Sequence, residues 1–326
     1  MPSRPRILYY TPDTNQPSWG IGMLYTHVRL LVQNGFPAYV LHRQSAFRLA
    51  WLDTEVPREA LDDPDFHLSA DDLLVVPEVV VARQVVRDLR CRRIVFVQGS
   101  SLIIPGLREH RGYAALGYER AIAVMPHVGK ILERHFDLPV TVIPPCIAPY
   151  FFAEPWDRPP GLSASEGARN PEIVLYPKPL SEDQANLEWL LKRGLGRREP
   201  WRLVELRGLS HRQVAAAMRQ SAFHVNVNCQ ESFNATVPEA MAAGCISICY
   251  DAYGGQDFLR DGHNAYVFPN HHLYPLVERL FELIDDYPNR SEEISALRAC
   301  AFETAAKYLE AYTAQALVEF YRTLLA

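Results

Sequence analysis

The chain has 326 residues, which is long for one domain and ample for two. Hydrophobic residues make up 48% and charged residues 22%, a balance typical of a globular protein with a sizeable core. The formal net charge of −5 provides no bulk attraction to nucleic acid, so we expect no nucleic-acid partner.

We expect neither a targeting segment nor a membrane span. The first residues, MPSRPRILYYTPD, lack the apolar stretch of a signal peptide, and no run approaches the roughly 20 apolar residues of a spanning helix. The six cysteines form no CxxC pair, and most lie within or beside apolar segments. This pattern predicts free thiols in a reducing compartment and a cytoplasmic protein.

The first half of the chain alternates short apolar runs with amphipathic stretches. The runs are rich in Val and Ile and apolar on both faces, as are strands of a parallel sheet covered by helices. We expect helices at Met23–Asn34 and Val79–Arg90. The predicted strands are Ile7–Tyr10, Ala38–His42, Leu73–Pro77, Ile94–Gln98, Ala121–Met125 and Val140–Ile143.

A dense run of prolines interrupts this alternation. Seven prolines lie between Pro144 and Pro171, a density that excludes helix interiors and central strands. We interpret 151–171 as a linker between an N-terminal domain, 1–150, and a second domain, 172–304. A terminal helix at about 305–326 is expected to pack back on the first domain.

The alternation then resumes, which predicts a second doubly wound parallel sheet. The expected strands are Ile173–Tyr176, Arg202–Leu206, His224–Asn228, Cys245–Tyr250 and Ala265–Phe268, and the expected helices are Gln213–Gln220, Pro238–Ala243, Leu273–Asp285 and Ser291–Leu325. Ligands of such sheets bind beyond the carboxyl ends of the strands, so we expect a site in a cleft between the two domains.

The segment 230–244, QESFNATVPEAMAAG, follows a predicted strand and leads into a short helix. Thr236 fits an N-cap and Gly244 the C-terminal stop. Backbone N–H groups at a helix N-terminus favour an anion. Glu231 and Glu239 frame the loop, and carboxylates accept hydrogen bonds from hydroxyls. The segment therefore suits a ligand with both phosphates and sugar hydroxyls.

Structural readings compete at both glutamates. Thr236 and Glu239 have capping-box spacing, in which the carboxylate bonds back to the N-cap amide. Glu231 precedes the helix and follows a buried strand, where a carboxylate is often simply solvated. The residue types alone leave these alternatives open.

The letters ESFNATVPEAMAAG resemble the E-x7-E motif of retaining GT-B glycosyltransferases, especially glycosyltransferase family 4, whose usual form is roughly E-G-F-G-L-P-x-x-E-A-M-A-x-G. Glu231 and Glu239 stand at the two acidic positions. The flanking segments GLSHRQVAAAMRQSAFHVNVN and YDAYGGQDFLRDGHNAYVFPN are also similar to that family. The resemblance is strongest over about 205–270.

The resemblance implies a GT-B architecture, with two Rossmann-like domains facing a cleft. It places the acceptor on the N-terminal domain and the nucleotide-sugar on the second. Glu231 would contact hydroxyls of the donor sugar, and Glu239 would hold those of the ribose. A donor-side segment would face the sugar and diphosphate, and it consists of Phe233, Asn234, Ala235 and Thr236.

The chain departs from the family pattern at its basic residues. The family has G-R-x-x-x-x-K after the first strand of the second domain, and this chain has LYPKPLSEDQAN. Lys178 replaces the Arg as a point charge on the diphosphate, without the bidentate fork; the structural alternative is an ordinary exposed lysine. The second basic position is lost, so Arg207 is a candidate substitute. Asn234 stands for a motif glycine and tolerates left-handed backbone.

On the acceptor side, Gly20 and Gly22 match the family's Gly-rich loop. Gln98 stands where many relatives have a His at a strand end, and it can bond an acceptor hydroxyl but cannot act as a base. His127 is a weaker candidate, with a surface or helix-cap role as the alternative. We find no His or Cys spacing that predicts a metal site.

Five arginines lie close together in the sequence. A solvated helix face is the default interpretation, and contact with anionic lipid or a lipid-pyrophosphate acceptor is the alternative. This second interpretation would place the protein peripherally on the inner face of the membrane. The five are Arg83, Arg87, Arg90, Arg92 and Arg93.

These observations predict a retaining, metal-independent glycosyltransferase that needs no cofactor beyond its nucleotide-sugar substrate. The acceptor would be a glycan or lipid-linked molecule, as in synthesis of bacterial surface polysaccharide or glycoconjugate. Two alternatives stay open: an inactive binding or accessory protein of the same fold, and a nucleotide-sugar epimerase. A dehydrogenase is disfavoured because the loop PDTNQPSWGIG lacks G-x-G-x-x-G with a downstream acidic partner.

Overall fold

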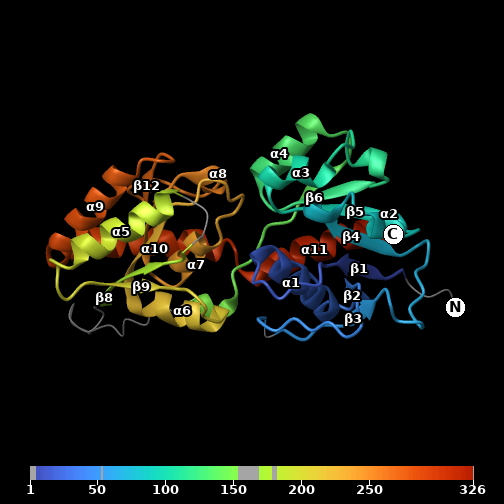
Figure 1. Ribbon diagram of the computed structural model, residues 1–326, viewed down its shortest axis with the longest axis horizontal. Helices are drawn as coiled ribbons and strands as arrows, with labels where there is room; N and C mark the ends of the chain where they lie inside the picture. The colour runs from blue at the N-terminus through green and yellow to red at the C-terminus, as the bar shows by residue number, and fades with distance from the viewer. Residues whose placement is uncertain (1–4, 53, 153–168, 178–181, 326) are drawn as a thin grey trace. The chain divides into compact units, whose positions relative to one another are not determined.

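The computed structural model describes residues 5–52, 54–152, 169–177 and 182–325. The chain divides into two compact units (Figure 1). Unit 1 comprises Met1–Pro145 and Ala311–Ala326, and unit 2 comprises Cys146–Glu310. Among the described residues, no helix combines the length and the apolarity that a membrane crossing requires.

Unit 1 is built on a seven-stranded sheet in the order β3-β2-β1-β4-β5-β6-β7, with every neighbouring pair parallel. Its strands are β1 (Ile7–Tyr10), β2 (Ala38–His42), β3 (Arg58–Ala60), β4 (Leu73–Pro77), β5 (Arg92–Val97), β6 (Arg120–Ala123) and β7 (Val140–Val142). Its helices are α1 (Trp19–Gln33), α2 (Gln84–Arg87), α3 (Ile103–Leu107), α4 (Pro126–His135) and α11 (Glu310–Leu325).

The C-terminal helix α11 is anchored in the core of unit 1. The Tyr321 hydroxyl lies 2.9 Å from the Tyr9 hydroxyl on β1, and both side chains are fully buried. Thr313 Oγ1 also donates to the carbonyl oxygen of Pro144 at 2.9 Å. Because buried hydroxyls need partners, these bonds tie the end of the chain to the first sheet.

Unit 2 contains a five-stranded parallel sheet in the order β12-β11-β10-β8-β9. Its strands are β8 (Asn170–Leu175), β9 (Arg202–Glu205), β10 (Ser221–Asn226), β11 (Ile246–Tyr250) and β12 (Tyr266–Phe268). Its helices are α5 (Glu182–Leu195), α6 (His211–Gln220), α7 (Thr236–Ala242), α8 (Ala252–Gly255), α9 (Leu273–Asp285) and α10 (Ser291–Ala306).

The predicted fold class is confirmed: both units are α/β with doubly wound parallel sheets. β1, β2, β4 and α9 have the predicted bounds. The largest error is Val79–Arg90, which forms a 3-10 turn at Glu78–Val80 and the single turn of α2 rather than one helix. Its buried residues, such as Val80, Val81 and Val86, pack into the core from short turns and not from one face of a helix.

Other predicted elements change at their ends. Helix α1 begins at Trp19, so Gly20 and Gly22 lie in its first turns and not in a loop. The predicted helix Ser291–Leu325 is two helices, α10 and α11. The predicted linker overlaps ordered structure at its end, because β8 begins at Asn170 and includes Pro171. The rest of that range, 153–168, lies outside the described residues.

Candidate functional site

The segment 230–244 lies at the switch point of the second sheet. The chain builds β8 and β9 toward one edge and β10, β11 and β12 toward the other, so the order reverses between β8 and β10. In sheets of this kind, the carboxyl ends of the strands beside the reversal leave the crevice in which ligands bind. The segment follows β10 directly and continues into α7.

Two buried asparagines shape this loop. Asn226, at the end of β10, and Asn234 exchange amide hydrogen bonds of 3.0 and 3.2 Å, and they are only 3% and 2% exposed. Asn226 Nδ2 also donates to Thr236 Oγ1 at 2.8 Å. Asn234 has a φ of 54°, as expected for a residue that replaces a glycine. Asn226 was not predicted as a site residue, because its only signal in the sequence is a polar residue at the end of an apolar strand.

Helix α8 contacts the loop between β10 and α7 through a backbone hydrogen bond. Gly254 N–H donates to the carbonyl oxygen of Glu231 at 2.8 Å. A Cβ atom on Gly254 would lie 2.5 Å from the carbonyl oxygen of Ser232, so the backbones meet where only glycine fits. The glycine at this position therefore keeps the Glu231 backbone in place.

Glu239 contacts a histidine instead of capping its own helix. Thr236 is the first residue of α7 and not its N-cap, and the N-cap residue, Ala235, makes no side-chain cap. The predicted capping box is therefore wrong: Thr236 Oγ1 accepts from Asn226, and Glu239 Oε1 lies 3.0 Å from His211 Nε2. The Glu239 side chain is 6% exposed.

His211 is the first residue of α6 and connects Glu239 to Tyr150. Its Nδ1 lies 2.6 Å from the Tyr150 hydroxyl. Ser210 caps this helix in a complete capping box with Gln213, which fixes where the helix begins. His211 lies in a segment that resembles the family, but its role was not predicted, because nothing in the sequence pairs it with Glu239.

The other predicted donor-side residues differ in burial. Phe233 is 2% exposed and packs its ring 4.9 Å from that of Tyr308, so its side chain belongs to the core. Glu231 and Ala235 are partly exposed. Along the described chain, the N–H groups of Asn234 and Ala235 have no hydrogen-bond acceptor. Unpaired N–H groups of this kind are suited to an anionic ligand.

Of the two predicted basic residues of unit 2, Arg207 lies within the described part of the chain. Lys178 lies outside the described residues. Arg207 is exposed in the turn after β9. Asp183, one of the two acidic residues at the lost basic position, accepts from Tyr250 and pairs with His271, whose Nδ1 lies 2.9 Å from Asp183 Oδ2. In the described part of the chain, no group of three or more His, Cys, Asp or Glu is placed to hold a metal ion.

In unit 1, two of the predicted acceptor-side residues meet. Gln98 follows β5, and a Cβ atom on Gly20 would lie 2.3 Å from Gln98 Oε1, so the first turn of α1 packs directly on this amide. Gln98 Nε2 is buried and has no partner among the described residues. Gly22 instead faces Trp51, whose ring would lie 3.8 Å from an added Cβ atom.

Glu78, which was not predicted from the sequence, lies beside the segment of Gln98 and Gly99. It follows β4, next to the order reversal of the first sheet between β1 and β4. The side chain is 2% exposed, and Glu78 Oε1 accepts from Gly99 N–H at 2.7 Å. Burial raises the pKa of Glu78 to about 7, although backbone hydrogen bonds, including those of Gln98 and Gly99, act to lower it.

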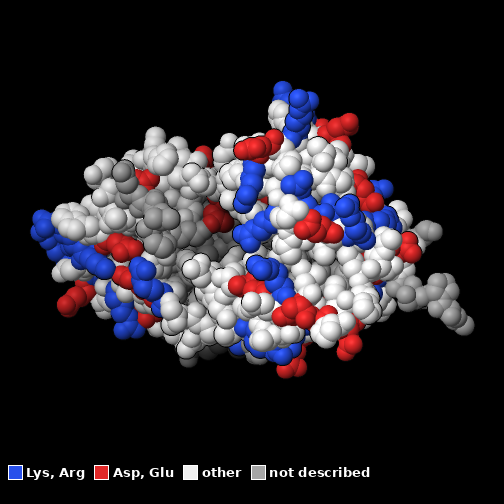
Figure 2. Space-filling model, turned by 45° about the vertical axis from the view of Figure 1, so that its right-hand side comes forward, with Lys and Arg blue, Asp and Glu red and all other residues white. Residues whose placement is uncertain are grey.

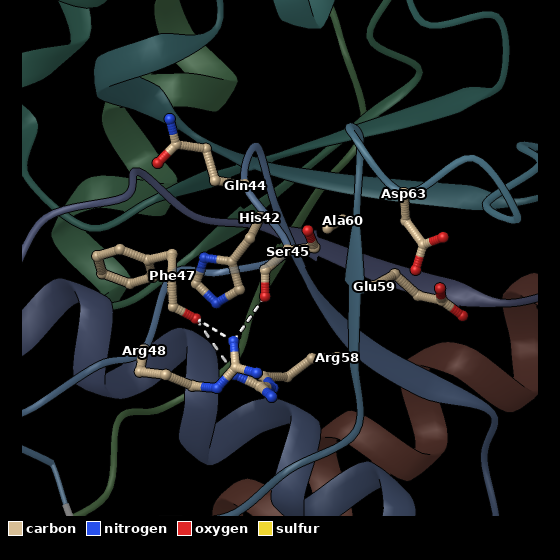
Figure 3. Close-up of a pocket in the computed structure, with 9 residues that line it drawn as sticks. All are labelled: His42, Gln44, Ser45, Phe47, Arg48, Arg58, Glu59, Ala60 and Asp63. Atoms are coloured by element: carbon tan, nitrogen blue, oxygen red, sulfur yellow. Dashed lines mark hydrogen bonds between the residues drawn. The ribbon is translucent and has the colours of Figure 1, made fainter.

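A polar pocket of about 380 Å³ lies beside β2 and β3 of unit 1 (Figure 3). Arg48 and Arg58 both donate to the carbonyl oxygen of Phe47, at 2.7 and 3.3 Å, and neither has a carboxylate partner in the described chain. Glu59 and Asp63 line the opposite side. Both charge signs are therefore available to a polar ligand there.

His42 lines the pocket, and two hydrogen bonds fix its imidazole ring. Its Nδ1 lies 2.9 Å from Asp13 Oδ1, and its Nε2 lies 2.9 Å from the Tyr25 hydroxyl. A carboxylate only accepts, so Nδ1 carries the proton and Nε2 accepts from Tyr25. Burial lowers the pKa of His42, and the Asp13 hydrogen bond opposes that shift. His42 is thus a neutral, fixed wall residue.

The predicted arginine face is partly structural. Arg92 pairs with Glu119 at 2.9 Å, and Arg93 donates to the carbonyl oxygens of Leu116 and Arg87 at 2.9 and 3.0 Å. On the face drawn in Figure 2, basic side chains are interspersed with acidic ones. His127, the weaker acceptor-side candidate, is buried in α4.

Comparison with known proteins adds a family match. Residues 178–286 match the family model described as "Glycosyl transferases group 1", a range that includes the whole segment 230–244. Over 109 residues the chain is 25% identical to the GtfA subunit of the UDP-N-acetylglucosamine–peptide N-acetylglucosaminyltransferase of Streptococcus pneumoniae serotype 4. That match covers 32% of this chain, which spans about a fifth (21%) of the length of the curated relative.

Several solved structures match nearly the whole chain. A glycosyltransferase from Rickettsia africae has a TM-score of 0.69 at 11% identity, with 99% of each chain covered. HepE from Anabaena, solved in complex with UDP, has a TM-score of 0.67 at 13% identity, covering 98% of this chain and 100% of that one. These likenesses show the fold, a GT-B architecture with two Rossmann-like units.

Proposed function

We propose that this chain is a glycosyltransferase that moves a sugar from a nucleotide-diphosphate donor to a glycan or lipid-linked acceptor, with retention of configuration. One observation carries the proposal. Glu231 lies in the loop that follows β10, and Glu239 lies in helix α7, which continues from that loop at the switch point of the second sheet; both are inside the range that matches the glycosyltransferase family model. Bacterial surface polysaccharide or glycoconjugate synthesis is the proposed role.

In the proposed reaction, the bond between the anomeric carbon and the diphosphate oxygen breaks. A bond from the acceptor oxygen forms on the same face, and the acceptor proton passes to the departing diphosphate. Glu231 would hold hydroxyls of the sugar as charge develops on its ring, and Glu239 would hold the ribose. The N–H groups of Asn234 and Ala235, with Lys178, would stabilise the leaving diphosphate electrostatically.

We place the acceptor on unit 1, at the carboxyl edge of its sheet. Gly20 and Gln98 lie together there, and the buried Gln98 Nε2 lacks a partner among the described residues. A buried donor without a partner costs free energy, which an acceptor hydroxyl would recover. Contact with a membrane surface is a further part of the proposal, through the exposed residues Arg83, Arg87 and Arg90.

The decisive test combines binding and turnover. Nucleotide-sugars should raise the melting temperature, because a ligand at 100 times its dissociation constant adds about 2.7 kcal/mol to stability. Glu239→Ala should weaken a nucleoside diphosphate and the whole donor by similar factors, roughly 10- to 150-fold by calorimetry. Binding without transfer to any acceptor would favour the accessory protein, and a new sugar nucleotide formed without acceptor would indicate an epimerase.

Transfer should not depend on a divalent metal ion. In the proposed site, backbone N–H groups and Lys178 supply the positive charge that the diphosphate needs as it leaves. Turnover measured after EDTA treatment and gel filtration should equal that of untreated protein. Activity that disappears with EDTA and returns only with magnesium or manganese would contradict this assignment.

A further inference from the structure

Tyr150, His211 and Glu239 form a hydrogen-bonded chain in unit 2. The Tyr150 hydroxyl lies 2.6 Å from His211 Nδ1, and His211 Nε2 lies 3.0 Å from Glu239 Oε1. A carboxylate can only accept a hydrogen bond, so His211 Nε2 carries a proton and donates a hydrogen bond to Glu239. His211 Nδ1 pairs with the Tyr150 hydroxyl, which can donate or accept. The carboxylate therefore fixes the direction of the His211–Glu239 hydrogen bond.

The imidazole is held by packing as well as by hydrogen bonds. The rings of Phe151 and Tyr150 lie edge-on to it, with centroids 4.8 and 5.6 Å away. The guanidinium group of Arg212 lies 4.6 Å from the Tyr150 ring centroid. A ring fixed on two sides can aim its N–H group at one carboxylate oxygen with little loss of conformational freedom.

Only one oxygen of Glu239 is used in this arrangement. Oε1 accepts from His211, and Oε2 has no hydrogen-bond partner within the described residues. The Glu239 side chain is 6% exposed, and its second oxygen is not among the buried side-chain atoms that lack a partner, so a hydroxyl group of a ligand can reach that oxygen.

We propose that His211 is a positioning residue for the nucleoside part of the donor: with Tyr150 behind it, His211 orients the Glu239 carboxylate so that the second oxygen accepts from the ribose hydroxyls. This inference rests on the proposed function, which places the ribose at Glu239. It adds a residue that acts through Glu239 and touches no substrate.

The test is a set of calorimetric titrations. UDP, GDP and ADP are first compared on the wild type, and the tightest binder is used with its 2′,3′-dideoxy counterpart. His211→Phe keeps a ring but removes both hydrogen bonds. It should weaken the nucleoside diphosphate about 10-fold and leave the dideoxy ligand within about twofold of wild type. His211→Gln, whose amide can donate to Glu239, should recover most of the lost affinity.

A double-mutant cycle links the effect to Glu239. In a Glu239→Ala background, His211→Phe should no longer change affinity for the nucleoside diphosphate. His263→Phe, an exposed histidine of the same unit, is the matched control and should bind like wild type. Melting curves on every variant report whether the fold is retained.

The results distinguish failure of the inference about His211 from failure of the proposed function. Equal weakening of the ribose and dideoxy ligands by His211→Phe would mean a merely structural role and would overturn the inference. So would normal affinity in His211→Phe when Glu239→Ala binds weakly. If Glu239→Ala itself binds every nucleoside diphosphate like wild type, or if none of the three binds the wild type, the proposed function fails first.

Discussion

Replacing Glu231 with Ala is expected to lower turnover about 100-fold while affinity for the free nucleoside diphosphate stays within about twofold. The proposed contact is to the transferred sugar, so it strengthens as charge develops and is absent when no sugar is bound. The Glu231 backbone should stay in place, since its carbonyl oxygen is held by Gly254 N–H at 2.8 Å. Steady-state kinetics and calorimetry on one preparation give both quantities.

Two further variants sharpen this result. Glu231→Gln keeps the shape but loses the charge, and an intermediate rate would show that the charge itself contributes. Gln230→Ala changes the exposed neighbour and should transfer sugar like wild type. Wild-type turnover in Glu231→Ala would remove this residue from the site. A parallel loss of nucleotide affinity would indicate that the loop had moved.

The strands were the most predictable part of the fold. Runs such as Leu73–Pro77 are short, rich in Val and Leu and apolar on both faces, a pattern typical of strands in a covered parallel sheet. Val79–Arg90 was mispredicted because its apolar spacing fits a helix equally well. Tertiary packing decided the outcome, since Val80, Val81 and Val86 are all buried in short turns. The edge strand β3 was missed because REA carries no apolar run.

The site was predictable where a local pattern existed and not where contacts are long-range. The segment 230–244 stands out by its sequence alone, and the left-handed Asn234 was expected from its place in the motif. A capping box was one interpretation of Glu239, because Thr236 lies at the matching spacing. Its actual partner, His211, is 28 positions away, and no local pattern encodes that distance. Asn226 and Glu78 were missed for the same reason.

The buried carboxyl group of Glu78 is expected to lower the stability of unit 1 at neutral and alkaline pH. Its pKa is 4.5 in the unfolded reference and about 7 in the folded protein, because burial disfavours the charged form. A raised carboxyl pKa costs no stability below pH 4.5. The cost grows as the pH rises through the window between the two values and is fully present above about pH 7. The shift corresponds to about 3 kcal/mol.

Glu78→Gln is therefore expected to stabilise unit 1 at pH 8 by up to about 3 kcal/mol, and the gain should fade to nothing at pH 4. The amide oxygen can still accept from Gly99 N–H, so the loop that carries Gln98 keeps its anchor. Denaturant titrations of both proteins at several pH values measure the difference in stability, in which the titration of all other groups cancels.

The exposed Glu133, replaced by Gln, is the matched control, and its effect on stability should change little with pH. A difference between wild type and Glu78→Gln that stays constant from pH 4 to pH 8 would show that the buried carboxyl does not titrate in this range. A gain in stability accompanied by weaker acceptor binding would instead show that the negative charge is kept, at a cost in stability, to hold Gln98 toward its acceptor.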